Sequence, residues 1–328
     1  MSPTTSPTPS PTLHISPQAH RAATLYSPRA AQYNFSQSWH PSYSRRLTDL
    51  ISFRDGNAVL SLCCGTGLEL LPIAMRVGEQ GLVVGVDVCR DMLDVARGSL
   101  GEGGVEIDEE VLVKGGRTGR MGGMGEVVLG RGDVTHLEKQ CSQEEETGEK
   151  AKRLVPPQGF DVIICSNSFP LLPNPSQVLR HWHDYLRPEG GLLVVDIPHD
   201  RSIRSGFLSA AVADRLGTPL DPTKSWVGGV DKFKTLLEQE GYQVERVLEL
   251  DKVEPVREVF YDALEDADGQ FEYVVRMEVV SEVVRAWRGD DKARQVWREE
   301  FARLAEGDGD GRVEVVEGNW VLFARRTG

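Results

Sequence analysis

The 328-residue sequence lacks any long uninterrupted apolar stretch. A helix that crosses a membrane needs about 18 or more consecutive apolar residues, and no such run is present. The N-terminus also lacks the apolar core of a secretory signal. We therefore expect a protein with no membrane span.

Cysteine is scarce as well, with five residues and no pair in a CxxC spacing. An odd number without such pairs argues against both a disulfide framework and a zinc site. Three of the five lie in or beside apolar runs, where cysteine acts as a small buried hydrophobic residue. We expect a reducing compartment and a cytoplasmic location. The cluster "DIPHD" at 196–200 has metal-ligating atoms but is too small a set to indicate a metal, so none is expected.

Acidic residues are absent from the first 48 positions, although the whole chain has a formal net charge of -13. Such an acidic body does not attract phosphate backbones, so we expect no nucleic-acid partner. Residues 1–29 are rich in Ser, Thr and Pro, which predicts a disordered tail. An organelle transit peptide is the alternative, although its prolines oppose an amphipathic helix.

From residue 30 onward, short apolar runs alternate with helical patterns. Seven runs are predicted strands: 57–64, 81–88, 125–134, 160–168, 191–198, 243–250 and 319–326. Strands that are apolar throughout and alternate with helices indicate a parallel sheet covered on both faces. The predicted fold class is α/β, with a doubly wound, mostly parallel, seven-stranded sheet.

Three segments interrupt this alternation within the predicted domain at 30–328. The glycine-rich segment 101–125 and the charged segment 138–157 are predicted surface insertions. Residues 250–311 have apolar residues at helical spacing and are predicted to form a helical cap before the last strand. The cap and its neighbourhood contribute aromatic residues suited to an apolar acceptor, namely Trp226, Phe260, Tyr261 and Trp287.

The loop after the first strand, "CCGTG" at 63–67, points to a nucleotide. Ligands of open α/β sheets bind at the carboxyl ends of the strands, and Asp87 ends the second strand, where it can accept hydrogen bonds from both ribose hydroxyls. Nicotinamide dinucleotides and S-adenosylmethionine both have such a ribose. A dinucleotide fingerprint would need a third glycine where Leu70 stands. Glu69 would also repel a pyrophosphate at the helix start, whereas S-adenosylmethionine has no phosphate.

Five motifs occur in order over residues 57–200: "VLSLCCGTG", "VVGVDVCRDMLDVAR", "GDVTHL", "FDVIICSNSF" and "LRPEGGLLVVDIP". In this order and spacing they resemble the class I S-adenosylmethionine-dependent methyltransferases, which have a Rossmann-like fold. The segment 225–247 is similar to small-molecule members related to the quinone-biosynthesis C-methyltransferases. The resemblance implies S-adenosyl-L-methionine as cofactor and a small-molecule substrate.

The resemblance also implies a role for individual residues. Asp87 would hold the ribose hydroxyls, Val88 would lie against the adenine, and Asp133 would accept the adenine amino group beside Val134. An alternative for Asp133 is a turn or helix cap. The remaining implied cofactor-binding residues are Ser61, Cys63, Cys64, Gly65, Gly67, Ser166, Asn167 and Tyr33.

Two positions depart from the family pattern. An acid that holds the methionine ammonium usually stands where this sequence has Ser61, and Cys63 replaces the first glycine of the motif. Because serine supplies no charge, a second hypothesis stays open. It is a non-methylating enzyme on this scaffold, such as a cyclase or pericyclase. A third, a non-catalytic interaction protein, is disfavoured by the presence of both Asp87 and Asp133.

Methyl transfer requires positioning of the reactants and at most one base. His199 follows the fifth predicted strand, and His40 lies in an N-terminal aromatic segment that in similar enzymes folds over the cofactor. Both are candidate catalytic residues, and a loop or capping role is the alternative for each. The predicted activity is methyl transfer to O, N or C of a small, largely apolar acceptor, for which secondary metabolism is one setting. The oligomeric state is left open.

Overall fold

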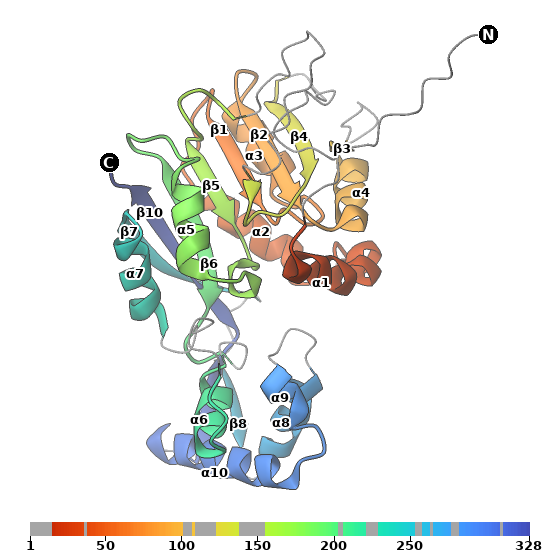
Figure 1. Ribbon diagram of the computed structural model, residues 1–328, viewed down its shortest axis with the longest axis vertical. Coiled ribbons are helices and arrows are strands. Elements are labelled where there is room, and N and C mark those ends of the chain that lie inside the picture. The colour runs from red at the N-terminus through yellow and green to blue at the C-terminus, as the bar shows by residue number, and fades with distance from the viewer. Residues whose placement is uncertain are drawn as a thin grey trace, which may run out of the picture.

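The computed structural model describes residues 15–35, 38–100, 107–108, 123–137, 155–202, 206–220, 229–252, 258–262, 265–276, 282–308 and 311–328. Figure 1 shows a twisted sheet with helices on both faces and a smaller lobe beyond one end of the sheet. No helix among the described residues is long and apolar enough to cross a membrane.

The sheet contains the seven predicted strands and one more. Its order is β3-β4-β2-β1-β5-β6-β10-β7, and β10 is antiparallel to both of its neighbours, whereas the other pairs are parallel. The bounds are β1 Ala58–Leu62, β2 Leu82–Asp87, β3 Ile107–Asp108, β4 Glu126–Arg131, β5 Val162–Cys165, β6 Leu192–Pro198, β7 Tyr242–Asp251 and β10 Gly318–Arg326. The predicted α/β class with a mostly parallel sheet is confirmed.

The extra strand β3 lies within the segment 101–125, for which the sequence predicts a surface insertion. Ile107 and Asp108 pair in parallel with Leu129 and Gly130 of β4. Without them, β4 would leave a row of unpaired backbone groups at the edge of the sheet. Residues 101–106, 109–122 and 138–154 lie outside the described part of the chain.

Two apolar cores pack on opposite faces of the sheet, which explains why its strands are apolar throughout. One core contains residues of α5 and α7, and the other contains residues of α2, α3 and α4. These helices are α2 His40–Asp49, α3 Leu70–Val77, α4 Arg90–Ser99, α5 Pro175–His183 and α7 Gly229–Gln239. The parallel strands therefore have both faces covered, and their carboxyl ends share one edge.

The smaller lobe has a third apolar core of its own (Figure 1). Its elements are α6 Phe207–Arg215, β8 Glu258–Asp262, α8 Ala267–Arg276, α9 Glu282–Ala286, α10 Asp291–Asp308 and β9 Arg312–Val316. The segment 250–311 is thus not wholly helical, because β8 pairs with β9 as a two-stranded antiparallel sheet. Trp287 is 4% exposed inside this core, so it serves packing and does not line an acceptor site as expected.

The N-terminal segment corrects the predicted disordered tail over 1–29. Residues 1–14 lie outside the described part, but Pro17–Tyr26 form helix α1 and Ser27–Gln32 form the 3-10 helix η1. Ser16 caps α1 by accepting a hydrogen bond from the Ala19 amide, and Pro17 suits the first helical turn. Ala23, Tyr26 and Ala30 are in an apolar cluster with Cys89 and Met92. Composition alone missed the helix because its stability comes from this tertiary contact.

Candidate functional site

The loop between β1 and α3 turns sharply, with positive φ angles at Cys63, Gly65 and Gly67. A Cβ added at Gly67 would lie 2.9 Å from the Ala96 Cβ, so this glycine permits close packing of α4 against the loop. A Cβ at Gly65 would meet nothing within 4 Å, so the space beside the loop is open there. The loop therefore offers backbone groups to a ligand that approaches closely.

The loop cysteines are packing residues in this arrangement. Cys64 is buried, and burial raises the pKa of its thiol well above the ordinary value. Burial has the same effect on the pKa of Cys165, at the end of β5 beside Cys63. Neutral thiols are poor nucleophiles and poor metal ligands. Among the described residues, Cys63, Cys64, Cys89 and Cys165 are all unpaired in disulfides.

Asp87 ends β2 and ties it to the loop after β1. Its carboxylate accepts hydrogen bonds from the amides of Gly65 and Cys89, both at 2.8 Å. Burial raises the pKa of Asp87, and these backbone donors partly oppose the shift. The carboxylate is thus fixed at the carboxyl edge of the sheet with lone pairs left for further donors.

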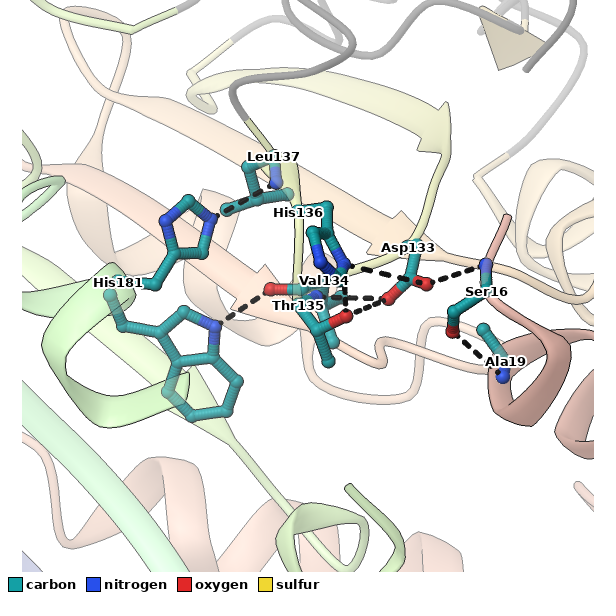
Figure 2. A network of polar contacts seen from close by, with 9 residues as sticks. Ser16, Ala19, Asp133, Val134, Thr135, His136, Leu137 and His181 are labelled. Carbon is teal, nitrogen blue, oxygen red and sulfur yellow. Dashed lines mark hydrogen bonds and ion pairs between the residues drawn. The ribbon is translucent and has the colours of Figure 1, made fainter. Parts of the chain in front are cut away.

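Asp133, after β4, is held in a network that joins three elements (Figure 2). One carboxylate oxygen accepts from the amide and hydroxyl of Thr135, and the other accepts from the amide of Ser16 at 3.0 Å. Burial by itself raises the pKa of Asp133, but the hydrogen bonds from Ser16 and Thr135 outweigh it and lower the pKa overall. The predicted capping alternative is therefore present, since Asp133 caps the turn that begins with it. The added bond from the N-terminal segment was not predicted.

The residues after Asp133 are anchored to α5. The Val134 carbonyl accepts a hydrogen bond from the Trp182 indole at 2.9 Å. The Leu137 amide donates to a ring nitrogen of His181 at 3.0 Å (Figure 2). This second contact gives His181 a structural role.

An aromatic segment lies over the loop after β1. The His40 ring stacks on Tyr33 with centroids 4.1 Å apart, and it is tilted against Trp39 with centroids 3.8 Å apart. Next to Tyr33, the Asn34 side chain accepts a hydrogen bond from the Thr66 hydroxyl at 2.5 Å. Burial raises the pKa of Tyr33, and the negative charges of two nearby carboxylates, Glu69 and Asp87, raise it further. The structure thus brings Tyr33 to the predicted cofactor-binding residues.

A buried polar network lies at the carboxyl ends of β5 and β6. Asp196 accepts from the Tyr43 hydroxyl at 2.5 Å and from the Asn167 amide at 2.7 Å. The Asn319 side-chain amide bonds to Tyr43, Asn167 and Asp196 at 3.1, 2.9 and 3.3 Å. These contacts hold Asn167 in a left-handed conformation, with φ of 55°, which non-glycine residues adopt at a cost. The network therefore fixes the turn that carries Ser166 and Asn167.

His199 lies close to this edge, but one of its two ring nitrogens already forms a hydrogen bond. Its Nδ1 accepts a hydrogen bond from the Arg201 amide at 3.1 Å, and the ring stacks on Trp320 with centroids 4.6 Å apart. The other ring nitrogen, Nε2, lies 3.7 Å from the Glu249 carboxylate. Because Nδ1 accepts the bond from Arg201, the neutral ring carries its proton on Nε2, and His199 can act as a base only at Nδ1, after the Arg201 bond opens. Its catalytic role stays a prediction, as does that of His40.

Sequence reasoning missed the polar contacts of three buried residues at this edge: Tyr43, Glu69 and Asn319. Glu69 carried one signal, since it is an acid inside the apolar pattern "GLELL" and is 7% exposed. Tyr43 and Asn319 carried none, because no local pattern marks a residue whose partners are distant in the chain.

The burial of the Glu69 carboxylate is expected to lower the free energy of unfolding at neutral pH. Burial raises the pKa of Glu69 above the ordinary 4.5, so the folded state disfavours the charged form. Each unit of such a shift costs about 1.4 kcal/mol once the group is ionised. Glu69→Gln is therefore expected to raise the free energy of unfolding at pH 7, as measured by urea denaturation.

The sign of this effect depends on pH. Well below pH 4.5 Glu69 is neutral in both the folded and the unfolded state, and the two proteins should be about equally stable. As the pH rises through the raised folded pKa, the native protein loses stability relative to the variant. A variant less stable than the native protein at pH 7 would contradict this prediction.

Comparison with known proteins supports this picture. The family described as "Methyltransferase domain" matches residues 36–247. A demethylmenaquinone methyltransferase from Lactobacillus johnsonii is 25% identical over 239 residues, which cover 68% of this chain and 84% of that protein. Nocamycin O-methyltransferase from Saccharothrix syringae is 30% identical over 147 residues, 45% of this chain and 40% of that protein.

A solved structure also resembles the chain in shape. It is an S-adenosylmethionine-dependent methyltransferase from Thiobacillus denitrificans in complex with S-adenosyl-L-homocysteine. The TM-score is 0.47 at 15% identity, and the likeness covers 93% of this chain and 98% of the other.

Proposed function

We infer the function from one premise: the chain belongs to the methyltransferase-domain family. It is an S-adenosylmethionine-dependent methyltransferase with a Rossmann-like α/β fold, and it acts on a small organic molecule. The finer proposal concerns the residues that bind the cofactor and the nature of the acceptor. The observation that carries it is the buried carboxylate of Asp87, held against the open side of the glycine loop.

The residues present fit S-adenosylmethionine. Asp87 would hold the ribose hydroxyls, because it is a fixed acceptor at the end of β2. Asp133 would accept the adenine amino group in exchange for one of its hydrogen bonds from Ser16 or Thr135, which occupy its acceptor sites, and Val134 would contribute its backbone. The open space at Gly65 supports a closely approaching ligand at the loop.

When bound, the cofactor supplies a methyl group already activated by its sulfonium. The chain's own contribution is positioning and exclusion of water. Tyr33, Trp39 and His40 would form a wall over the loop, since the His40 ring contacts both aromatic rings. His199 would take up the acceptor's proton at Nδ1 once its hydrogen bond from the Arg201 amide opens, with Glu249 near enough to Nε2 to stabilise the resulting imidazolium.

The acceptor we propose is largely apolar, with methylation at O, N or C. The named substrates of the two relatives, demethylmenaquinone and nocamycin, are small organic molecules. The aromatic wall near the loop adds apolar surface of the kind that binds such molecules. Of the other predicted acceptor-binding aromatics, Trp226 lies outside the described residues, as do the side chains of Phe260 and Tyr261. A cytoplasmic location and the absence of a nucleic-acid partner stay predictions.

The test is a calorimetric titration of the native protein with S-adenosylmethionine, followed by incubation with a panel of quinols, phenols and carboxylic acids. We expect micromolar binding, as for typical enzyme substrates. For at least one acceptor we expect S-adenosylhomocysteine and a product heavier by one methyl group, both measured by mass spectrometry.

Two results would contradict the proposal. Failure of the native protein to bind S-adenosylmethionine would remove its basis. A converted acceptor of unchanged mass, formed without S-adenosylhomocysteine, would instead identify the non-methylating enzyme that Ser61 and Cys63 left open.

A further inference from the structure

We propose that Glu69 supplies the negative charge that the chain lacks at Ser61, and that its carboxylate binds the α-ammonium group of S-adenosylmethionine. This inference rests on the proposed function and adds a specific ligand-binding residue to it. Serine at 61 can accept a hydrogen bond but cannot balance a cation. The family pattern therefore leaves the ammonium of the methionine portion without a charged partner in this chain, unless another acid takes that place.

Glu69 stands at the right part of the site. It directly precedes α3, two residues beyond the last glycine of the loop, and its side chain is buried. Its Oε1 accepts a hydrogen bond from the Ser44 hydroxyl of α2 at 2.7 Å, and the Ser166 side chain at the end of β5 also hydrogen-bonds to it. Ser166 is a residue that the family resemblance places beside the methionine portion. Glu69 is thus held between the loop and that portion.

The surroundings of Glu69 are short of positive charge. The titratable groups that interact with it are Tyr33, Tyr43, Cys64, Cys165 and Asp196, which are either neutral or negative at pH 7. In the described part of the chain, no Lys, Arg or His nitrogen forms an ion pair with its carboxylate.

The cation near this region, Lys252, acts on another carboxylate. Lys252 acts on Asp196, lowering the pKa of that carboxyl group, and its ammonium lies 5.3 Å from the centre of the Trp39 ring. Of the two buried carboxylates, Asp196 therefore has a lysine that acts on it, and Glu69 has no such cation among the described contacts. A buried charge without a counter-ion is costly, and a cationic ligand removes that cost when it binds. The excess of one negative charge thus matches a ligand group that bears one positive charge.

The hydrogen-bonding capacity of Glu69 distinguishes between the two cationic groups of the ligand. An ionised carboxylate accepts about four hydrogen bonds, and Ser44 and Ser166 leave lone pairs unused. An ammonium group donates three hydrogen bonds, whereas a sulfonium has no proton to donate. Charge-assisted hydrogen bonds are the stronger kind, so the ammonium is the group that Glu69 selects.

A purely structural role is the competing explanation, since the Ser44 contact also joins α2 to α3. Glu69→Gln separates the two roles, because the glutamine carbonyl can still accept from Ser44 while the charge is gone. Glu189→Gln, at an exposed position, is the matched control for loss of one charge.

The experiment measures binding by calorimetry with two ligands. S-adenosylhomocysteine carries the ammonium, and 5′-methylthioadenosine lacks the whole aminocarboxyl portion. We expect Glu69→Gln to lower the affinity for S-adenosylhomocysteine by roughly ten- to one hundredfold. The affinity for 5′-methylthioadenosine should stay within about twofold of the native value. Glu189→Gln should change neither. Adding Ser61→Asp to Glu69→Gln should recover most of the lost affinity.

A second measurement needs no variant. In the native protein, affinity for S-adenosylhomocysteine should fall with decreasing pH, starting above 4.5, because protonated Glu69 no longer attracts the ammonium. The affinity for 5′-methylthioadenosine corrects for Asp87, whose carboxylate would meet the ribose of both ligands.

The inference is overturned if Glu69→Gln lowers the affinity for both ligands equally, or lowers the affinity for neither. It is also overturned if the two ligands share one pH profile in the native protein. A native protein that binds S-adenosylhomocysteine but shows these results leaves the proposed function intact. A native protein that binds no adenosyl ligand at all removes the proposed function itself.

Discussion

Asp87→Ala is expected to reduce the affinity for S-adenosylmethionine by about one hundredfold or more. A hydrogen bond to a charged group contributes roughly 1.5–3 kcal/mol, and the ribose would lose two such bonds. The alanine also releases the amides of Gly65 and Cys89, which the carboxylate holds at 2.8 Å. Loss of that preorganisation increases the effect, because the loop must then be ordered by the ligand.

Calorimetric titration checks this prediction, with Asp94→Asn as the control. Asp94 lies on α4 and pairs only with arginines of its own helix in the contacts described, so its variant should bind within about twofold of the native protein. Circular dichroism would establish that Asp87→Ala remains folded. If the folded variant binds with native affinity, Asp87 does not hold the ribose.

The pH dependence of binding follows from the direction of the Asp87 shift. Burial raises the pKa of this carboxyl group above its ordinary 3.8, so the proton is retained to a higher pH. Because the ionised form accepts hydrogen bonds better, affinity should begin to fall at a pH above 3.8 as the solution is acidified.

Asp196→Ala is expected to destabilise the protein by about 3 kcal/mol. The change leaves the Tyr43 hydroxyl, the Asn167 amide and the Asn319 side chain without their common acceptor in a buried region. Breaking such a network costs roughly 3–5 kcal/mol, and removal of a buried charge offsets part of that cost. Urea denaturation measures the change.

Tyr43→Phe provides the comparison for Asp196→Ala. It removes one hydroxyl and should cost about 1 kcal/mol. In the double variant the two costs should not add, because both changes disrupt the same hydrogen bond. Additive costs, or a loss below 1 kcal/mol for Asp196→Ala, would show that the network does not act as a unit.

Asp196 also links stability to the site. Its bond to the Asn167 amide helps to hold that residue at a φ of 55°, so the Ser166–Asn167 turn should relax when the acceptor is removed. Affinity for S-adenosylmethionine should therefore fall together with stability in Asp196→Ala, while Tyr43→Phe should retain most of it.

Much of the architecture could be predicted because it depends on local pattern. Apolar runs, helical spacing and turn residues lie within a few positions of one another, and they located all seven long strands of the sheet. The same kind of pattern placed Asp87 at the end of β2, where its carboxylate meets the glycine loop. Gly67 and the missing third glycine likewise distinguished this loop from a dinucleotide site.

The predictions that were wrong depended on tertiary contact. Composition predicted disorder up to residue 29, but α1 is stabilised by its apolar contacts and by the bond from Ser16 to Asp133. The segment 250–311 has helical spacing, but strand β8 forms because β9 is available to pair with it. In both cases the deciding partner lies far away in the sequence.

The sequence by itself determined the fold class and the cofactor, and it predicted the edge of the sheet at which the ligand would bind, because each depends on motifs that span short distances. Only the tertiary structure decided which side chains share that edge. Tyr43 and Asn319 are 276 positions apart and yet share a hydrogen bond. Glu69, which the sequence presented as a repulsive charge, becomes the candidate ammonium partner once Ser44 and Ser166 are seen beside it. The role of such a charged group depends on the residues around it, and folding brings those residues together from distant parts of the sequence.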